Sequence, residues 1–421
     1  PGAFAAGKQL PPNAAARKRM IALLSEDSPA LHAEFTDALR ASMGVDHFLR
    51  ECKAFPLTGG GDINLFALFA ELAYSVTCLG GQVGVLLPTA IATDTSNKTF
   101  FERIVHDNGL VSLYDFENRD AIFPAVHRSF KLCLLTLGQA SAAEFVCFAA
   151  QVSELSDPRR RFRLTPDEFR LINPNTLTCP VFRSERDAEL TKKLYRAASV
   201  LIKEGAHEEN PWSIRFHTRF FHMAEDSHHF LTEPDEGDVP LYEAKMMHLY
   251  DHRWATYELS GGVSRVCSES EKANSSYELT PRYWVHGIEY SKRVADAEIH
   301  GKFFFSWRLI TNATNERTFI ATVLPRVAVS HSLATIFFDR RTQAPRVACF
   351  LANLSSLTLD YCARQKIGGT NMTLGLVKQL PVFPPEYYSE ADLSFIIPRV
   401  LELTYTAHDL KSWAEDLGYD G

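Results

Sequence analysis

Side chains that could hold a metal ion or carry out acid–base chemistry gather between residues 217 and 252. His248 and His252 stand four residues apart, a spacing that would place both on one face of a helix. The zinc-protease pattern also needs Glu directly after the first histidine, but Leu249 stands there, and no cysteine pair completes a tetrahedral zinc set. We therefore interpret the histidines of this region as polar surface residues or contacts to DNA rather than metal ligands: His217, His222, His228, His229, His248 and His252.

Asp235, Glu243 and Lys245 offer a second kind of chemistry. An acidic residue followed by Glu-x-Lys resembles the core of restriction nucleases, in which carboxylates hold magnesium and the lysine assists the attacking water. Matches this short arise often by chance. Two other interpretations therefore stay open: Lys245 contacts DNA at the opening of a recognition domain, or the segment is an incidental surface loop.

Composition and cysteine usage place the chain among ordinary globular proteins, with 46% hydrophobic and 23% charged residues. Its eight cysteines are scattered singly, several within apolar segments, which favours reduced thiols and a cytoplasmic protein. We find no signal segment and no apolar run of membrane-spanning length, so no membrane partner is expected. The net charge of −7 argues mildly against a nucleic-acid binder, although it conceals local clusters.

The elements that would position any site are clearest from Gly59 to Leu137. Asp62 is a predicted N-cap for a helix with an apolar face, and Gly80-Gly81 is predicted to end it. Short apolar runs at 82–88, 111–116 and 131–137 predict buried strands, with a second helix at about 96–105. Helix, strand, helix, strand, turn and strand make half of a Rossmann-like α/β domain.

This half-domain resembles the second half of an adenine-specific (N6) DNA methyltransferase. More narrowly, it is similar to the large methylase polypeptides of restriction-modification and phage-defence systems, including type IIG enzymes. Three of its motifs carry the likeness: Gly80-Gly-Gln-Val-Gly-Val-Leu-Leu-Pro88, Asp115-Phe-Glu-Asn118 and Phe123-Pro-Ala-Val126. Further matches extend it over nearly the whole chain: Leu171-Ile-Asn-Pro-Asn-Thr176, Pro180-Val-Phe-Arg-Ser-Glu-Arg-Asp187, Tyr242-Glu-Ala-Lys-Met-Met-His248, Gln365-Lys-Ile-Gly-Gly-Thr370 and Lys378-Gln-Leu-Pro-Val382.

Two parts of the family pattern are missing. The glycine loop that holds S-adenosylmethionine has no counterpart here, and neither has the (Asp/Asn/Ser)-Pro-Pro-aromatic motif that grips the target amine. Asn173-Pro174 and Asn210-Pro211 lack the second proline. Family order would put both parts before residue 1, so we expect a C-terminal fragment. It would contain no catalytic, metal-binding or cofactor-binding residues of its own, and S-adenosylmethionine would bind the intact protein.

The resemblance implies a base-stacking role for Phe123. An enzyme that modifies an exocyclic amine must turn the base out of the duplex and stack it on an aromatic face. In the family, the Phe-Pro turn before the last strands supplies that ring, and Phe130 is a lesser candidate. Phe123 could instead be a core residue, as most phenylalanines are.

Strand-like runs between residues 257 and 385, a helix at 347–365 and a glycine loop resemble the specificity domain of TaqI-like enzymes and type I specificity subunits. The loop would approach DNA closely, although its glycines could simply cap the helix. Residues 321–380 carry a net charge of +5 and residues 381–421 one of −6, which suggests a groove and a solvated tail, or random surface charge. The residues expected to contact DNA are Lys245, His248, Arg253, Arg364, Lys366, Gly368, Gly369 and Lys378.

We therefore predict a partial Rossmann-like α/β half followed by an α+β target-recognition domain. The expected function is adenine-N6 methylation of double-stranded DNA in a restriction-modification or defence system, with other subunits of such a system as possible partners. A DNA-specificity subunit that acts with a separate methylase is the alternative, and a magnesium-dependent nuclease is a third. The expected divisions are a helical insertion (1–55), the methyltransferase half (56–150), a hinge and start of the recognition region (151–255), and the recognition domain with an acidic helical tail (256–421).

Overall fold

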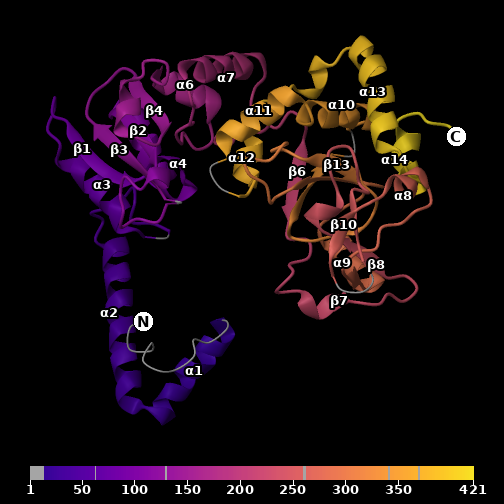
Figure 1. Ribbon diagram of the computed structural model, residues 1–421, viewed down its shortest axis with the longest axis horizontal. Coiled ribbons are helices and arrows are strands. Elements are labelled where there is room, and N and C mark those ends of the chain that lie inside the picture. Colours follow the sequence, from indigo (N-terminus) through magenta and orange to yellow (C-terminus); the bar gives the residue numbers. More distant parts are fainter. Residues whose placement is uncertain (1–13, 62, 129, 259–261, 340–341, 368–369) are drawn as a thin grey trace.

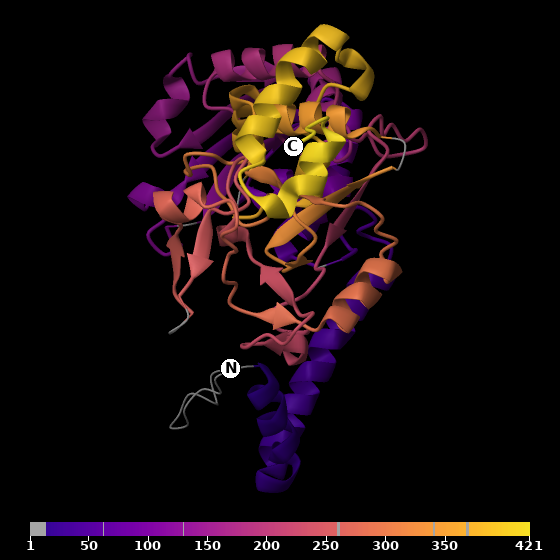
Figure 2. The same ribbon diagram turned by 90° about the vertical axis from the view of Figure 1, so that its right-hand side faces the viewer.

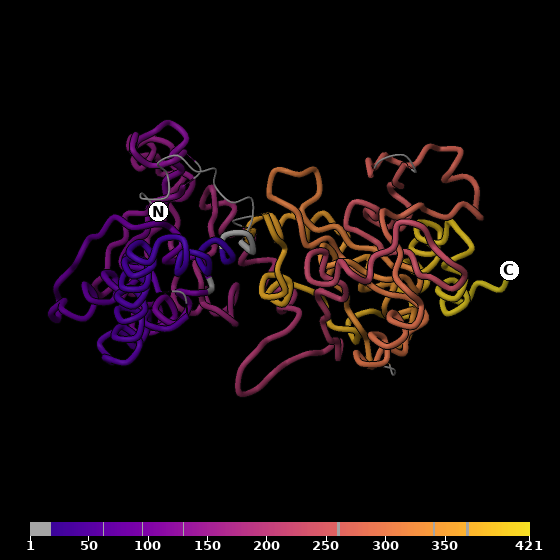
Figure 3. Tube along the Cα trace, turned by 90° about the horizontal axis from the view of Figure 1, so that it is seen from below, coloured from indigo at the N-terminus to yellow at the C-terminus, as the bar shows by residue number. Residues whose placement is uncertain are grey.

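The chain folds into two lobes of mixed helix and sheet, which a computed structural model shows side by side (Figure 1). The first lobe ends with α7, and the second begins near β6. Seen from below in Figure 3, the lobes lie at opposite ends of an elongated molecule. The structure describes residues 14–61, 63–128, 130–258, 262–339, 342–367 and 370–421.

A helical hairpin projects from the first lobe and corresponds to the predicted helical insertion (Figures 1 and 2). It consists of α1 Ala14–Asp27 and α2 Pro29–Glu51, and α2 buries none of its residues. At its base, the guanidinium of Arg50 donates to the carbonyl oxygen of Gly61 at 2.7 Å. The hairpin is therefore an arm beside the globular core rather than a part of it.

A mixed sheet in the order β1-β3-β2-β4-β5 forms the centre of the first lobe. β3 is antiparallel to both β1 and β2, while β2 and β4 are parallel, so β1, β2 and β4 run in one direction. Cys133, Leu135 and Leu137 alternate into the core, and Leu134 between them is exposed. The three predicted strands are confirmed as β1 Val83–Pro88, β2 Leu110–Glu117 and β3 Lys131–Leu137, and the sheet also contains β4 Ala143–Ala149 and β5 Phe162–Leu164.

Helices pack around this sheet. The predicted second helix is α5 Lys98–His106, which buries Phe100, Phe101 and Ile104. The first predicted helix, α3 Leu65–Val76, is shorter than expected: extended backbone at Asn64 and Thr77 flanks it, and Gly80 lies in the following turn. Asp62 lies outside the described residues. The remaining helices of this lobe are α4 Ala90–Thr93, α6 Pro166–Ile172 and α7 Glu185–Ala197.

The second lobe is built on a sheet in the order β13-β12-β15-β6 and a smaller one in the order β14-β8-β11-β7. Because β6 pairs with β15, this lobe begins within the range predicted as a hinge (151–255). The strands are β6 Ile214–Thr218, β7 Phe230–Leu231, β8 Val239–Tyr242, β9 Ala255–Tyr257, β10 Ser264–Val266, β11 Trp284–Val285, β12 Phe304–Arg308, β13 Ala321–Leu324, β14 Ala328–Val329 and β15 Leu333–Phe338.

The helix predicted at 347–365 is two helices in the structure. The break falls at Ser355 and Ser356, because the hydroxyl of Ser356 accepts the backbone N–H of Leu359 and starts a new helix. The helices of this lobe are α8 Glu269–Ala273, α9 Gly287–Asp296, α10 Ala344–Leu354, α11 Leu357–Lys366, α12 Leu374–Lys378, α13 Glu390–Thr404 and α14 Lys411–Asp416.

The lobes share a continuous hydrophobic cluster. It runs from Phe100 and Leu135 of the first lobe, through Tyr195 of α7, to Trp307 and Leu351 of the second. A second cluster fills the far part of the second lobe, around β8 and α9. The lobes are therefore joined by a packed interface and not by a free linker.

Candidate nucleic-acid interface

The carboxyl ends of β1, β2 and β4 meet at one edge of the first-lobe sheet. In open α/β sheets, ligands bind outside this edge. Thr89 follows β1, Asp115 lies near the end of β2, and Phe148 lies near the end of β4. The loop that carries Phe123 leaves from the same end of β2. This carboxyl edge is the candidate site.

Asp115 ties the three strand ends together. It is 1% exposed, and its carboxylate accepts the hydroxyl of Thr89 at 2.6 Å and the backbone N–H of Phe148 at 3.2 Å. Burial raises the pKa of Asp115, while the bond from Thr89 and the charge of Lys131 oppose that shift. With both oxygens occupied, Asp115 serves to position its neighbours.

Asn118 holds the Phe123 loop in place. Its buried amide donates to the carbonyl oxygens of Phe123 at 3.0 Å and Val126 at 2.8 Å, and its oxygen accepts the N–H of Phe123 at 2.9 Å. Phe123 is half-buried on this braced loop, and Phe130 is more exposed. The structure thus places both predicted aromatic residues on the connection that leaves the carboxyl edge.

Phe148 is a residue at this edge that sequence reasoning missed. Its φ of +59° lies in the left-handed region, which is unusual for a large side chain. Lys131 Nζ lies over its ring at 4.6 Å from the centroid, and the guanidinium of Arg183 at 5.3 Å. A strand pattern carries no signal of positive φ, and the one hint in the sequence is that Arg183 stands in a family motif, at residues 180–187.

Arg159, Arg160, Arg161 and Arg163 form a basic cluster, and nearby carboxylates neutralise most of its charge. Arg160 pairs with Glu154 at 3.0 Å, and Arg161 with Glu144 at 2.7 Å. Hydrogen bonds from Tyr114 and Arg163 and the charge of Arg161 hold the pKa of Glu144 below its ordinary value, although desolvation opposes them. These ion pairs hold the β4–β5 connection against the sheet and leave little positive charge for a phosphate.

Two predicted DNA contacts of the second lobe remain accessible. Lys245 is exposed, and its Nζ lies 4.9 Å from the ring centroid of Tyr257. His248 is half-buried beside Trp254, with ring centroids 4.4 Å apart, and burial lowers the pKa of its imidazole.

Arg253 corrects the prediction made for it. The residue is 1% exposed, and its guanidinium donates to four main-chain carbonyl oxygens, with N···O distances from 2.7 to 3.0 Å. A buried guanidinium with these partners cannot reach a phosphate. Three of the acceptors, Lys272, Asn274 and Tyr277, lie in one segment, and the fourth, Thr406, lies far along the chain.

Three further predicted contacts have protein partners in this conformation. Arg364 donates to the carbonyl oxygens of Ala313 and Glu316 at 2.8 and 2.9 Å. Lys378 pairs with Glu204 at 2.5 Å. The ammonium group of Lys366 is enclosed, although its stem is partly exposed, and it donates to the carbonyl oxygen of Ile172 at 2.8 Å and to the side-chain oxygen of Asn173. Gly368 and Gly369 lie outside the described residues.

The metal and nuclease interpretations find no support in the described part of the chain. It contains no group of three or more His, Cys, Asp or Glu side chains placed to hold a metal ion. His248 and His252 lie in turns and not on a helix, and His252 is buried against Asp409 at 2.9 Å. Glu243 accepts the hydroxyl of Tyr257 at 2.6 Å.

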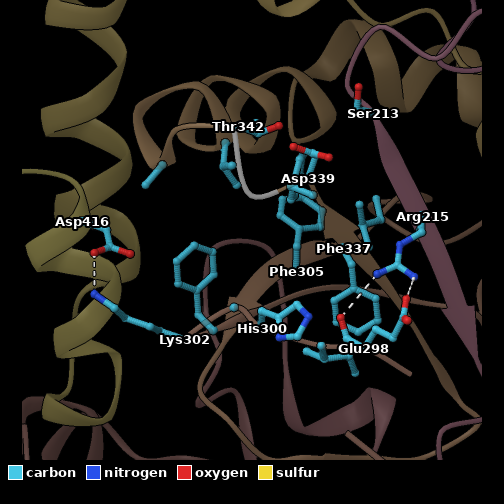
Figure 4. Close-up of a pocket in the computed structure, with 17 residues that line it drawn as sticks. Ser213, Arg215, Glu298, His300, Lys302, Phe305, Phe337, Asp339, Thr342 and Asp416 are labelled. Atoms are coloured by element: carbon cyan, nitrogen blue, oxygen red, sulfur yellow. Dashed lines mark hydrogen bonds and ion pairs between the residues drawn. The ribbon is translucent and has the colours of Figure 1, made fainter. Parts of the chain in front are cut away.

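A pocket of about 1010 Å³ opens in the second lobe (Figure 4). Phe305 lies among its lining residues, and charged side chains pair across it. Arg215 is 3.6 Å from Glu298, and Lys302 is 2.9 Å from Asp416. Since both of these cations already face a carboxylate, the pocket has little attraction for phosphate.

Helices within the described ranges are too short or too polar to cross a bilayer. No protein-family model and no curated protein matches the sequence. The chain is similar to the type IIG restriction endonuclease BpuSI, with 12% identity and a TM-score of 0.30 over 86% of this chain and 49% of that chain. It is also similar to the type IIL restriction-modification enzyme MmeI in complex with DNA, with 10% identity and a TM-score of 0.41 over 88% of this chain and 52% of that one.

The chain spans about half the length of each of these two proteins. Its structural neighbours are thus restriction-modification enzymes. Because both TM-scores are low, the function is inferred from the geometry of this chain and not from these neighbours.

Proposed function

We propose that this chain supplies the base-stacking and DNA-recognition parts of an adenine-N6 DNA methyltransferase of a restriction-modification or defence system. The observation that carries the proposal is the position of Phe123. Its half-buried ring stands on a loop braced by Asn118, at the carboxyl edge of parallel strands. An enzyme that works on an extruded base needs an aromatic face held at such an edge.

The strand order supports the same proposal. β3 runs antiparallel between β1 and β2, which run in one direction. These strand directions bring the carboxyl ends of β1, β2 and β4 to one edge, where open α/β sheets bind their ligands. β1 lies at the end of the described sheet, so one of its edges is free to pair with a further strand.

Exposed apolar side chains beside β1 indicate that another unit covers this region. α3 turns one apolar stripe to solvent, and Leu86 of β1 and Leu134 of β3 are exposed as well. An apolar surface of this kind usually marks an interface. We infer a second α/β unit that continues the sheet beyond β1. The residues of the stripe follow helical spacing: Leu65, Phe69, Leu72 and Val76.

The described residues do not fit S-adenosylmethionine. At the end of β1, the hydroxyl of Thr89 is bonded to Asp115, and the family's glycine loop is absent from the sequence. We therefore assign the methyl donor and the catalytic loop to the second unit. The described residues would stack the extruded adenine and contact the DNA around it, with Lys245 and His248 as the accessible candidates in the second lobe.

Binding of labelled duplexes tests this proposal. The chain should bind a duplex with a mismatched or abasic target more tightly than a fully paired one, because less unpairing is needed. Phe123→Ala should weaken binding to the mismatched duplex severalfold, since stacking contributes about 1–3 kcal/mol per base. The unfolding midpoint of the Phe123→Ala variant should stay close to that of the wild type.

Phe130→Ala is the matched control, because Phe130 lies on the same loop and is more exposed. If both variants lose the same amount of DNA affinity, the effect comes from general apolar contact and not from stacking on Phe123. If the wild-type chain shows no affinity for DNA even at low salt, the proposed function is wrong.

A further inference from the structure

We propose that Lys131, Phe148 and Arg183, here called the cation–ring cluster, form a second contact for an unpaired stretch of DNA beside the extruded base. The cluster would hold a backbone phosphate with its two cations and offer its ring to a neighbouring base. This proposal rests on the proposed function, because it assumes that DNA lies along the carboxyl edge.

The backbone of Phe148 is held in a costly conformation. A left-handed φ is costly for a non-glycine residue, because it brings the Cβ atom too close to the following carbonyl oxygen. Two side chains hold it there: Asp115 accepts the N–H of Phe148 at 3.2 Å, and Arg160 donates to its carbonyl oxygen at 3.4 Å. Strain of this kind concentrates at functional sites. Here it sets the direction of a half-buried ring at the end of β4.

Nearby carboxylates balance the charge of the two cations over this ring only in part. Arg183 is exposed, and no carboxylate of the described residues lies within ion-pair distance of it. Lys131 Nζ is 3.4 Å from Glu117, but Arg119 pairs with the same carboxylate at 2.8 Å. Lys131 and Arg119 thus share the Glu117 carboxylate, and Arg183 adds a further positive charge, in a chain whose net charge is −7. A local positive patch on an acidic protein is an electrostatic footprint for a polyanion.

The cluster lies one strand away from the Phe123 loop. Lys131 begins β3 directly after that loop and pairs in register with Glu117 of β2. On the other side of β2, Phe116 is in register with Ala149, the residue after Phe148. Lys131 and Phe148 therefore lie on either side of the end of β2, from which the Phe123 loop leaves.

Single-stranded nucleic acid is the ligand that this combination suits. Proteins that hold unpaired strands combine a positive surface with aromatic side chains on which bases stack. Extruding a base leaves its neighbours partly unstacked, so such a strand is present during the proposed reaction. The second-lobe pocket has no such excess of positive charge, because its Arg215 and Lys302 are each paired with a carboxylate.

The salt dependence of DNA binding tests the cluster. Arg183→Gln and Lys131→Gln should each weaken binding to a mismatched duplex and reduce the slope of log affinity against log salt by about 1. Arg399→Gln is the matched control: Arg399 also lies over a phenylalanine, 3.6 Å from the ring centroid of Phe395, but on α13 of the other lobe. It should leave affinity and slope unchanged.

The outcomes separate this inference from the proposed function. If the wild-type chain binds DNA and Arg183→Gln and Lys131→Gln both behave like Arg399→Gln, the cluster is no DNA contact, and the proposed function stands. If the wild-type chain shows no salt-dependent binding at all, the proposed function fails and the inference fails with it. The inference is supported if Arg183→Gln and Lys131→Gln reduce the slope of log affinity against log salt and Arg399→Gln does not.

Discussion

Asn118 shows how one buried polar side chain can shape a site. Its amide has three hydrogen bonds to the 123–126 loop, and together they fix a connection that carries no regular strand or helix. Asp360 works in the same way in the second lobe, where its carboxylate accepts the N–H groups of Thr318 and Phe319, both at 2.8 Å. Buried polar residues in this protein mostly organise nearby backbone.

Asn118→Ala should destabilise the chain by about 2–4 kcal/mol, because it removes three hydrogen bonds and leaves the N–H of Phe123 and the carbonyl oxygen of Val126 without their side-chain partner. Urea unfolding measures this loss. Asn118→Asp keeps an acceptor for Phe123 N–H but turns a carboxylate toward two carbonyl oxygens, so it should be no better than alanine. Wild-type stability in Asn118→Ala would contradict the bracing role.

The C-terminal elements are part of the second lobe and not the solvated tail that their acidity suggested. α13 packs against α10, and Trp413 of α14 is fully buried, with its indole N–H donating to Thr404 at 2.9 Å. His252 and Arg253 add polar links, to Asp409 and to the carbonyl oxygen of Thr406. Only the outer faces of these helices carry the acidic charge to solvent.

Arg253→Met should cost at least about 3 kcal/mol, because four charge-assisted hydrogen bonds are lost at a buried position. It should also make the segment around Thr406 sensitive to limited proteolysis. Arg265→Met is the control: Arg265 is partly exposed and pairs with Glu271 at 2.6 Å, so its loss should stay within about 1 kcal/mol. Equal effects of the two variants would show that Arg253 is no special anchor.

At the scale of the whole molecule, a small set of polar residues joins the lobes. Asn175 donates to the carbonyl oxygen of Ile202 at 2.9 Å, and its own N–H reaches the side chain of Gln379 at 3.2 Å. Lys366 of α11 donates to Ile172 at the end of α6. Together with the shared hydrophobic cluster, these bonds fix how the first lobe packs against the second.

Stability should depend on pH through Lys366. Burial lowers the pKa of its ammonium group to about 7 from the usual 10.5. Between these two values the unfolded chain binds more protons than the folded one, so this residue makes stability rise with pH from about 7 to 10. Below pH 7 both states keep the proton, and the contribution is flat.

Lys366→Met should remove that rise, which unfolding in urea at several pH values between 6 and 10 would show. Lys378→Met is the control, because Lys378 lies nearby but pairs with Glu204 at the surface. Should the wild type and Lys366→Met show the same pH dependence, burial of this ammonium group would have no such effect.

Local patterns in the sequence decided the elements of the first lobe. Short apolar runs predicted β1, β2 and β3, and the helical spacing of apolar residues predicted α3, because both signals depend on residues only a few positions apart. The Phe123 loop was also visible as a turn between strands.

Only the tertiary structure decided which polar residues are free to act. Arg253 and Lys245 are both basic residues of one short segment. Arg253 is nevertheless buried and donates to the carbonyl oxygen of Thr406, whereas Lys245 is exposed. Lys366 likewise has its partner at Ile172. Whether a charged side chain can reach a ligand depends on residues far along the chain. The local spacing of residues cannot predict such partners.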